Sequence, residues 1–135
     1  MDCIFCKIAE GKIPASKVYE NKDVIAFLDI SPVNKGHVLV LPKQHFENLQ
    51  KIPEALLCET VKAVKKIAPA VLKAVNAPAF NLSLNNGKEA GQLVPHLHFH
   101  IMPRFEKDGL GAWPSKKYED GEMQKVAERI KKEIK

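Results

Sequence analysis

Short runs of apolar and β-branched residues, separated by turn sequences, recur along the chain and predict five β-strands. The first two flank the polar sequence Glu-Asn-Lys-Asp at positions 20–23, which is typical of a turn. The predicted strands span residues 17–19, 24–28, 37–41, 79–84 and 96–102. Pro42 and Pro103 are expected to end the third and the fifth strand, because proline cannot donate a hydrogen bond to a neighbouring strand.

Between the third and the fourth predicted strand, the apolar residues recur with the period of a helix rather than that of a strand. Apolar residues recur at steps of three and four from about residue 53 to residue 75, which predicts a long amphipathic helix. Pro69 is expected to kink or split this helix, because its ring removes a backbone donor and clashes with the preceding turn. Cys58 is expected to be buried in it. The predicted apolar face comprises Leu57, Val61, Val64, Ala68, Val71 and Val75.

Two shorter helical segments are predicted near the ends of the chain. A helical turn is expected within residues 3–14, ending near Gly11, and residues 120–134 carry apolar side chains at four-residue steps. The strands therefore come in neighbouring pairs, and only one long helix lies between them. This order predicts an α+β domain with an antiparallel five-stranded sheet, one main helix and a C-terminal helix, rather than a doubly wound parallel sheet.

Length and composition fit one domain over residues 1–135, with 45% hydrophobic and 27% charged residues. No apolar run approaches the ~18 residues of a membrane span, and the first residues do not resemble a secretory signal. The three cysteines are therefore expected to be reduced or metal-bound, in a cytoplasmic protein. The net charge of +5 comes from lysines that are not interleaved with aromatic residues, so nucleic acid is not an expected partner.

Three of the five histidines, His96, His98 and His100, occupy alternate positions of the last predicted strand. Side chains on a strand alternate between its faces, so the three imidazoles should share one face. The opposite, apolar face should carry Leu97, Phe99 and Ile101. Buried imidazoles are costly unless their nitrogens have partners, so such a row indicates a specific chemistry.

Three interpretations of the histidine row were compared. A solvated strand face could carry one histidine by chance, but strict alternation of three argues against it. Two histidines at this spacing can bind zinc. Alternatively, a neutral imidazole can attack phosphorus while its neighbours supply hydrogen bonds and positive charge. The residues alone leave the metal and phosphate interpretations open.

The run His-φ-His-φ-His-φ-φ, in which φ is apolar, resembles the signature of the histidine triad (HIT) family. Further segments resemble that family in the same order: residues 4–8 with 13–14, residues 27–32, residues 36–43 with position 45, and residues 85–87 with 91–92. The resemblance covers about residues 3–104 and is nearest to the Hint-like branch of small prokaryotic type. It implies the HIT fold and a homodimer.

The resemblance also implies an activity, the hydrolysis of purine nucleoside phosphoramidates, dinucleoside polyphosphates or related nucleotidyl substrates. His98 would attack phosphorus and form a covalent nucleotidyl-imidazole, which water then cleaves. His100 would hydrogen-bond the phosphate and help to protonate the leaving group. Asn85 and the backbone of Gly91, Gln92 and Leu93 would hold phosphate oxygens.

The same resemblance assigns residues to the nucleoside. Asp29 would accept hydrogen bonds from the ribose hydroxyls, and His37 belongs to the same nucleotide site. The apolar slot for the base would comprise Ile8, Phe27 and Ile30.

Leu93 departs from the family pattern, in which many Hint-like members carry a serine. Leucine cannot donate a hydrogen bond, so a nucleotide-binding protein with negligible turnover is an alternative.

Cys3 and Cys6 are separated by two residues, which is the common half of a zinc site. In some prokaryotic members of the family, the positions of His45 and His96 complete a site of two cysteines and two histidines. We expect a closed structural zinc site here and no organic cofactor, with a metal-free pair of reduced thiols as the alternative. A rival enzyme, a zinc-dependent phosphate hydrolase, would instead hold a catalytic metal on His96 and His98.

Overall fold

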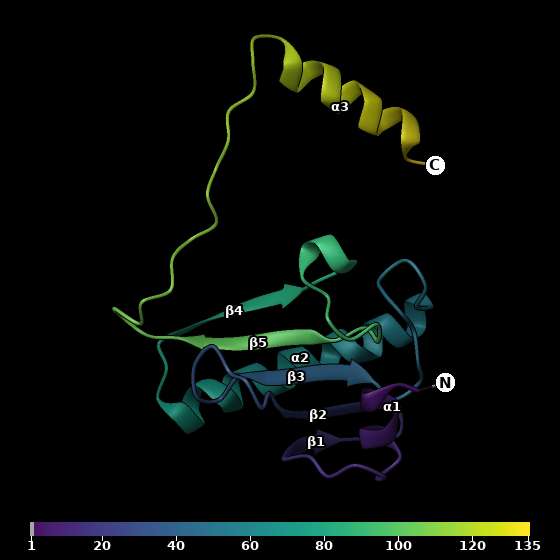
Figure 1. Ribbon diagram of the computed structural model, residues 1–135, viewed down its shortest axis with the longest axis vertical. Helices are drawn as coiled ribbons and strands as arrows, with labels where there is room; N and C mark the ends of the chain where they lie inside the picture. Colours follow the sequence, from purple (N-terminus) through teal and green to yellow (C-terminus); the bar gives the residue numbers. More distant parts are fainter. Residues whose placement is uncertain (1) are drawn as a thin grey trace.

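One antiparallel sheet forms the centre of the molecule (Figure 1). The structure is a computed structural model that describes residues 2–135. Within these residues the strands are β1 (Lys17–Glu20), β2 (Val24–Leu28), β3 (Val38–Pro42), β4 (Ala79–Leu84) and β5 (Phe99–Arg104), in the order β1-β2-β3-β5-β4. All neighbours pair antiparallel, which confirms the predicted α+β class.

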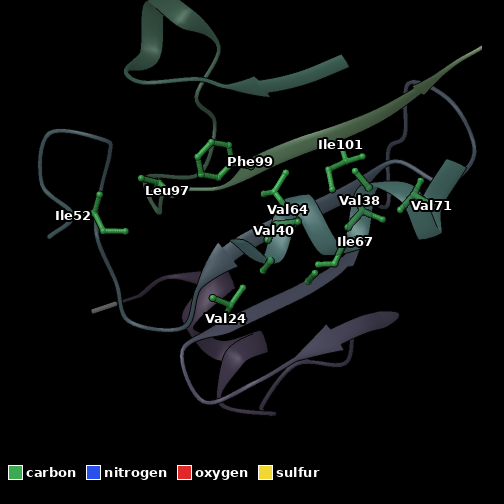
Figure 2. Packing of buried hydrophobic residues seen from close by; sticks show 13 residues of the cluster. Val24, Val38, Val40, Ile52, Val64, Ile67, Val71, Leu97, Phe99 and Ile101 are labelled. Atoms are coloured by element: carbon green, nitrogen blue, oxygen red, sulfur yellow. The ribbon is translucent and has the colours of Figure 1, made fainter. Parts of the chain in front are cut away.

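The long helix α2 (Glu54–Val75) covers one face of this sheet and closes the main hydrophobic core (Figure 2). Alternate residues of the strands, such as Val38 and Val40 in β3, contact it. Their neighbours Leu39 and Leu41 belong to a second cluster on the opposite face, so both faces of β3 are buried. Burial on both faces explains why this strand is a continuous apolar run.

The buried face of α2 is rotated from the predicted one. Val61 was predicted to face the core but is 43% exposed, and Cys58 is also exposed, so both predictions were wrong. Pro69 does not split the helix, which continues to Val75. Pro69 lies on the solvent side, where water can satisfy the carbonyl group that loses its donor. The buried residues are Thr60, Ala63, Val64, Ile67, Ala68 and Val71.

Strand β5 begins and ends later than predicted. The backbone N–H of Leu97 donates to the carbonyl of Phe46 (2.7 Å) instead of to a strand, so the segment before Phe99 lies outside the sheet. At the other end, Pro103 lies inside β5, opposite Phe80 of β4. The β3 side of β5 is paired only up to Ile101, so the missing N–H of Pro103 interrupts no ladder.

A short N-terminal helix, α1 (Ile4–Ala9), lies near β1 and β2 at one end of the sheet (Figure 1). Its Phe5 is buried in the second cluster and packs edge-on against Phe27 of β2, with ring centroids 5.6 Å apart. Cys3 belongs to the same cluster. This end of the sheet therefore brings the N-terminal cysteines to the segment that carries the histidines.

The C-terminal helix α3 (Glu122–Glu133) was predicted, and it lies well apart from the sheet at the end of an extended segment (Figure 1). Across Glu122–Glu133 no side chain is buried. Trp113, in the extended segment, is 91% exposed. Among the described residues, no helix combines the length and the apolar character needed to cross a membrane.

Candidate active site

The histidine row is largely buried on the face of the sheet opposite α2. His96 is completely buried and His98 is 8% exposed, whereas His100 is partly exposed. The rings of His98 and His100 are 4.8 Å apart between centroids. The alternate residues Leu97, Phe99 and Ile101 lie in the main core, so the predicted alternation of faces is confirmed.

The His98 ring has one possible protonation pattern when it is neutral. Its Nδ1 lies 2.7 Å from the backbone oxygen of His96. A carbonyl oxygen only accepts hydrogen bonds, so Nδ1 carries the proton and Nε2 keeps its lone pair. The His98 ring is thus arranged as a nucleophile at Nε2.

The same reasoning defines His37 and His100. The backbone N–H of Val33 donates to Nδ1 of His37 (3.1 Å), so the proton of neutral His37 must be on Nε2. His37 Nε2 lies 2.9 Å from His100 Nδ1 and therefore donates to it. His100 must then carry its own proton on Nε2, which makes Nε2 a hydrogen-bond donor toward the site. Two neighbouring histidines thus present opposite functions, a lone pair on His98 and an N–H group on His100.

Burial keeps these rings neutral. Desolvation lowers the pKa of His98 and His37, and it lowers the pKa of His100 to about 4. The carboxylate of Asp29 opposes this effect on all three rings, since a nearby negative charge favours an imidazolium. Neutral imidazole is the form that can act as a nucleophile, so the protonation states suit attack at neutral pH.

Asp29 follows β2 and faces the histidines. One carboxylate oxygen accepts from the backbone N–H of Ser31 (2.8 Å), and the other lies 3.6 Å from His37 Nε2. Of the residues expected to line the base slot, Phe27 is buried, Ile8 is partly buried and Ile30 is 99% exposed. Ile30 therefore lies at the surface, where only a bound molecule could cover it.

Phe5 contacts this site, although it was not among the predicted site residues. Its ring packs edge-on against His98, with centroids 5.0 Å apart and an interplanar angle of 83°. The ring also limits where His98 can move, because Phe5 is itself held by the buried cluster. Two sequence signals could have pointed to it, its position between the two cysteines and its place in the segment of residues 4–8 that resembles the family.

The loop expected to hold phosphate connects β4 to the histidine segment and contains a short 3₁₀ helix, η1 (Lys88–Ala90). Gly91 has a φ of +90°, a conformation that side chains other than glycine rarely adopt. The Asn85 amide points toward Gly91, since a Cβ built there would lie 3.7 Å from Asn85 Nδ2. Leu93 is 92% exposed.

The Gln92 side chain holds the loop itself. Its oxygen accepts from the N–H of Gly87 (2.9 Å), and its nitrogen donates to the carbonyl groups of Glu47 (2.6 Å) and Val94 (3.2 Å). The hydrogen-bonding groups of Gln92 are thus used within the protein. Its backbone N–H also donates within the loop, to the carbonyl of Gly87 (3.1 Å), as the N–H of Gly91 does to the carbonyl of Lys88 (3.0 Å). Neither N–H group can contact phosphate without breaking its bond within the loop.

Four potential metal ligands meet beside the histidine row, all with ligand atoms within 4.8 Å of one another: Cys3, Cys6, His45 and His96. His96 Nδ1 lies 3.5 Å from the sulfur of each cysteine, and His45 Nδ1 lies 3.4 Å from Cys6 Sγ. Bonds of ~2.3 Å to sulfur and ~2.0 Å to nitrogen around a tetrahedral zinc ion separate ligands by similar distances. The set therefore fits zinc.

The hydrogen bond between the His96 ring and a backbone carbonyl also fits a zinc site. Its Nε2 lies 2.8 Å from the carbonyl oxygen of Pro42, which must accept, so the lone pair is on Nδ1 toward the cysteines. Burial lowers the pKa of His96 to about 4, which leaves this lone pair available. Burial also raises the pKa of the Cys6 thiol to about 11, so the thiolate form requires a neighbouring cation.

Comparisons with known proteins agree with the observed fold. A crystal structure of a HIT-family protein from Bacillus subtilis has a TM-score of 0.92 and 44% identity, and the match covers 100% of this chain and 99% of that chain. A zinc-bound histidine triad family protein from Mycobacterium smegmatis has a TM-score of 0.78 and 32% identity, over 98% and 99% of the two chains.

A curated relative and a family model extend the comparison. An adenosine 5'-monophosphoramidase of Schizosaccharomyces pombe is 41% identical over 137 residues, which covers 100% of both chains. The model of the HIT domain matches residues 10–107, most of the chain. From this match and the shared fold we conclude that the chain belongs to the HIT family.

Proposed function

We propose that the protein hydrolyses nucleotidyl substrates, purine nucleoside phosphoramidates or related compounds, through a covalent nucleotide on His98. The observation that carries this proposal is the hydrogen bond from His98 Nδ1 to the His96 carbonyl, which leaves Nε2 as a buried neutral nucleophile. The identity to an adenosine 5'-monophosphoramidase supports the substrate class. Asp29 binds the ribose, and Ile8, Phe27 and Ile30 contact the base.

In the first step, His98 Nε2 forms a bond to phosphorus and the bond from phosphorus to the leaving atom breaks. His100 donates a hydrogen bond from Nε2 to the leaving atom, which departs with a proton taken from solvent. In the second step, water attacks phosphorus, the bond from phosphorus to His98 Nε2 breaks with its electron pair returning to the ring, and the proton of the water goes to solvent while His100 keeps its Nε2 proton. Asn85 and the backbone N–H of Leu93 hold the phosphate oxygens, where a backbone N–H group stabilises developing negative charge, since the N–H groups of Gly91 and Gln92 donate within the loop.

The covalent nucleotide is the species to detect. Substituting His100→Ala leaves His98 in place and removes an N–H group that assists hydrolysis of the covalent nucleotide. The p-nitrophenyl ester of AMP needs no proton on its leaving group, so the first step of this variant should remain fast with that substrate. Intact-mass spectrometry should then show one added AMP, located in the peptide that contains residues 96–102. The double variant His98→Ala/His100→Ala is the control and should show no adduct. Metal-dependent turnover without an adduct would contradict the proposal and favour the zinc-dependent hydrolase.

The geometry argues against a catalytic metal on His96 and His98. His96 Nδ1 faces the two cysteines, its Nε2 is hydrogen-bonded to Pro42, and His98 Nδ1 is hydrogen-bonded to a carbonyl. We propose instead that Cys3, Cys6, His45 and His96 hold a structural zinc ion. Such an ion would fasten α1 to the histidine segment and would take no part in the chemical steps.

A nucleotide-binding protein with negligible turnover remains the second candidate. The observation that favours it is Leu93, whose exposed side chain offers no hydrogen bond to phosphate or leaving group. Binding of nucleotide without formation of product would support this second candidate, whereas the adduct on His98 would count against it.

A further inference from the structure

A cluster of polar side chains outside the proposed active site ties two distant segments together. Asp108 is its centre, with a side chain that is only 6% exposed. Its carboxylate accepts from Arg104 Nε (2.8 Å) and Nη2 (3.0 Å), and from the backbone N–H groups of Phe105 and Leu110. It also accepts from Asn34 Nδ2 (3.1 Å), which lies 74 positions earlier in the chain.

Asn34 belongs to the loop between β2 and β3, which carries Asp29 and His37. Its amide group also donates to the carbonyl of Pro103 in β5 (2.9 Å). The loop is further held by Gly36, whose φ is +93° and where an added Cβ would lie 2.7 Å from a methyl group of Val75. The side chain of Asn34 therefore fastens this loop to the end of β5 and to Asp108.

The loop between β2 and β3, which Asn34 holds in place, also orients the ring of His37. Val33, whose N–H donates to His37 Nδ1, is the direct neighbour of Asn34. The backbone oxygen of Asn34 accepts from the N–H of His37 (3.2 Å). A shift of Asn34 would therefore move two of the groups that hold His37, the Val33 N–H and the Asn34 carbonyl.

We infer that Asn34 and Asp108 are positioning residues, which keep the proton of His100 on Nε2 through Val33 and His37. This inference rests on the proposed function, since it concerns the donor of that reaction. When Val33 N–H is in place, neutral His37 can only be protonated on Nε2, and His100 must accept at Nδ1. Without that N–H, His37 can carry its proton on Nδ1, and His100 can then donate from Nδ1 and lose its Nε2 proton.

The charge of Asp108 suits this role. Arg104 and the backbone N–H groups hold the pKa of the Asp108 carboxyl well below its usual range. Asp108 thus stays an acceptor for the Asn34 amide over the whole working range of pH. An uncharged carboxyl group would compete with Asn34 as a donor.

The test compares two leaving groups. Asn34→Ala and Asp108→Asn should each lower kcat for an AMP alkylamide about tenfold, a part of the roughly 10²- to 10⁴-fold that a positioned proton donor contributes. The p-nitrophenyl ester of AMP needs no proton on its leaving group, so its kcat should change less than about twofold. Equal losses with both substrates, or no loss with either, would overturn the inference.

Asn81→Ala is the matched control. The Asn81 side chain accepts from Arg104 Nη1 (2.7 Å), so it contacts the same arginine, but it lies on β4 and not on the loop. This variant should leave the rates for both substrates unchanged. A loss in Asn81→Ala equal to that in Asn34→Ala would assign the effect to Arg104 and contradict the role of the loop.

Nitrogen-15 NMR of the histidine rings gives a readout that is independent of turnover. In the wild-type protein His100 should be protonated on Nε2, and in Asn34→Ala a population protonated on Nδ1 should appear. An unchanged His100 ring in a variant that is folded would refute the inference even if activity fell. If the wild-type protein shows this protonation but the His100→Ala variant forms no nucleotide adduct, the proposed function fails while the positioning role stands.

Discussion

At the scale of single residues, His98 is the group on which the proposed chemistry depends. His98→Ala should lower turnover of adenosine phosphoramidate by at least about 10³-fold, because no other side chain can form the covalent intermediate. AMP affinity should stay within about twofold, since the groups assigned to base and ribose lie elsewhere. Steady-state kinetics and calorimetric titration with AMP measure the two effects. Substantial residual turnover would rule out the covalent route.

The buried histidines also predict how stability depends on pH. Burial lowers the pKa of His100 to about 4 from an ordinary value near 6.5. Between these values the unfolded chain binds a proton that the folded protein does not. The free energy of unfolding should therefore be highest above pH ~6.5 and fall by up to about 3 kcal/mol for this group as the pH falls to ~4.

Urea denaturation at a series of pH values measures this dependence. The variant His100→Asn is the comparison, because other groups, including zinc ligands, also take up protons at low pH. Its free energy of unfolding should fall less steeply between pH ~6.5 and ~4 than that of the wild type. Parallel curves for the two proteins would show that His100 does not contribute.

At the scale of elements, α1 is expected to depend on two metal ligands, Cys3 directly before it and Cys6 within it. Cys3→Ser should lower the zinc content from about one ion per chain and lower the Tm together, because a structural metal contributes to the free energy of folding. Elemental analysis and thermal unfolding of the same samples provide the measurement. Cys58→Ser is the matched control, since Cys58 is exposed on α2 and should change neither quantity.

Helices and strands in which apolar residues recur with a clear period could be predicted from the sequence. The ends of an element could not be predicted where they depend on contacts with distant residues. Strand β2 and the extent of α2 agree with the apolar pattern, because each depends on residues close together in the chain. The start of β5 was wrong by three residues, since Leu97 pairs with Phe46 of a distant loop. The burial of α2 was also partly wrong, because Thr60 rather than Val61 faces the sheet.

At the scale of the whole molecule, we predict a homodimer, as the resemblance to the family implies. The chain exposes apolar side chains on the edge strand β4 and in the C-terminal segment, including Phe80, Leu82 and Trp113. Exposed apolar side chains on an edge strand suit a contact with another molecule. Light scattering after gel filtration should give twice the chain mass of 15.1 kDa. A mass of one chain at every concentration tested would contradict the prediction.

The extent of one domain over residues 1–135 also stays a prediction. The sheet, α1 and α2 form a continuous packed unit, whereas α3 lies apart from it (Figure 1). Limited proteolysis in the segment between Arg104 and α3 would show whether the C-terminal helix is held by the rest of the protein.

The sequence by itself determined the class of fold and the alternation of the histidine row. These properties follow from periods and spacings among neighbours in the chain, whereas the resemblance to the family supplied the residues of the proposed nucleotide site and named His45 and His96 as partners of the cysteines. The tertiary structure alone decided which ring nitrogens carry protons. That choice depends on acceptors and donors such as the Pro42 carbonyl and the Val33 N–H, which only packing brings to the rings. The contact between Asn34 and Asp108 likewise joins residues 74 positions apart, and no local pattern encodes it.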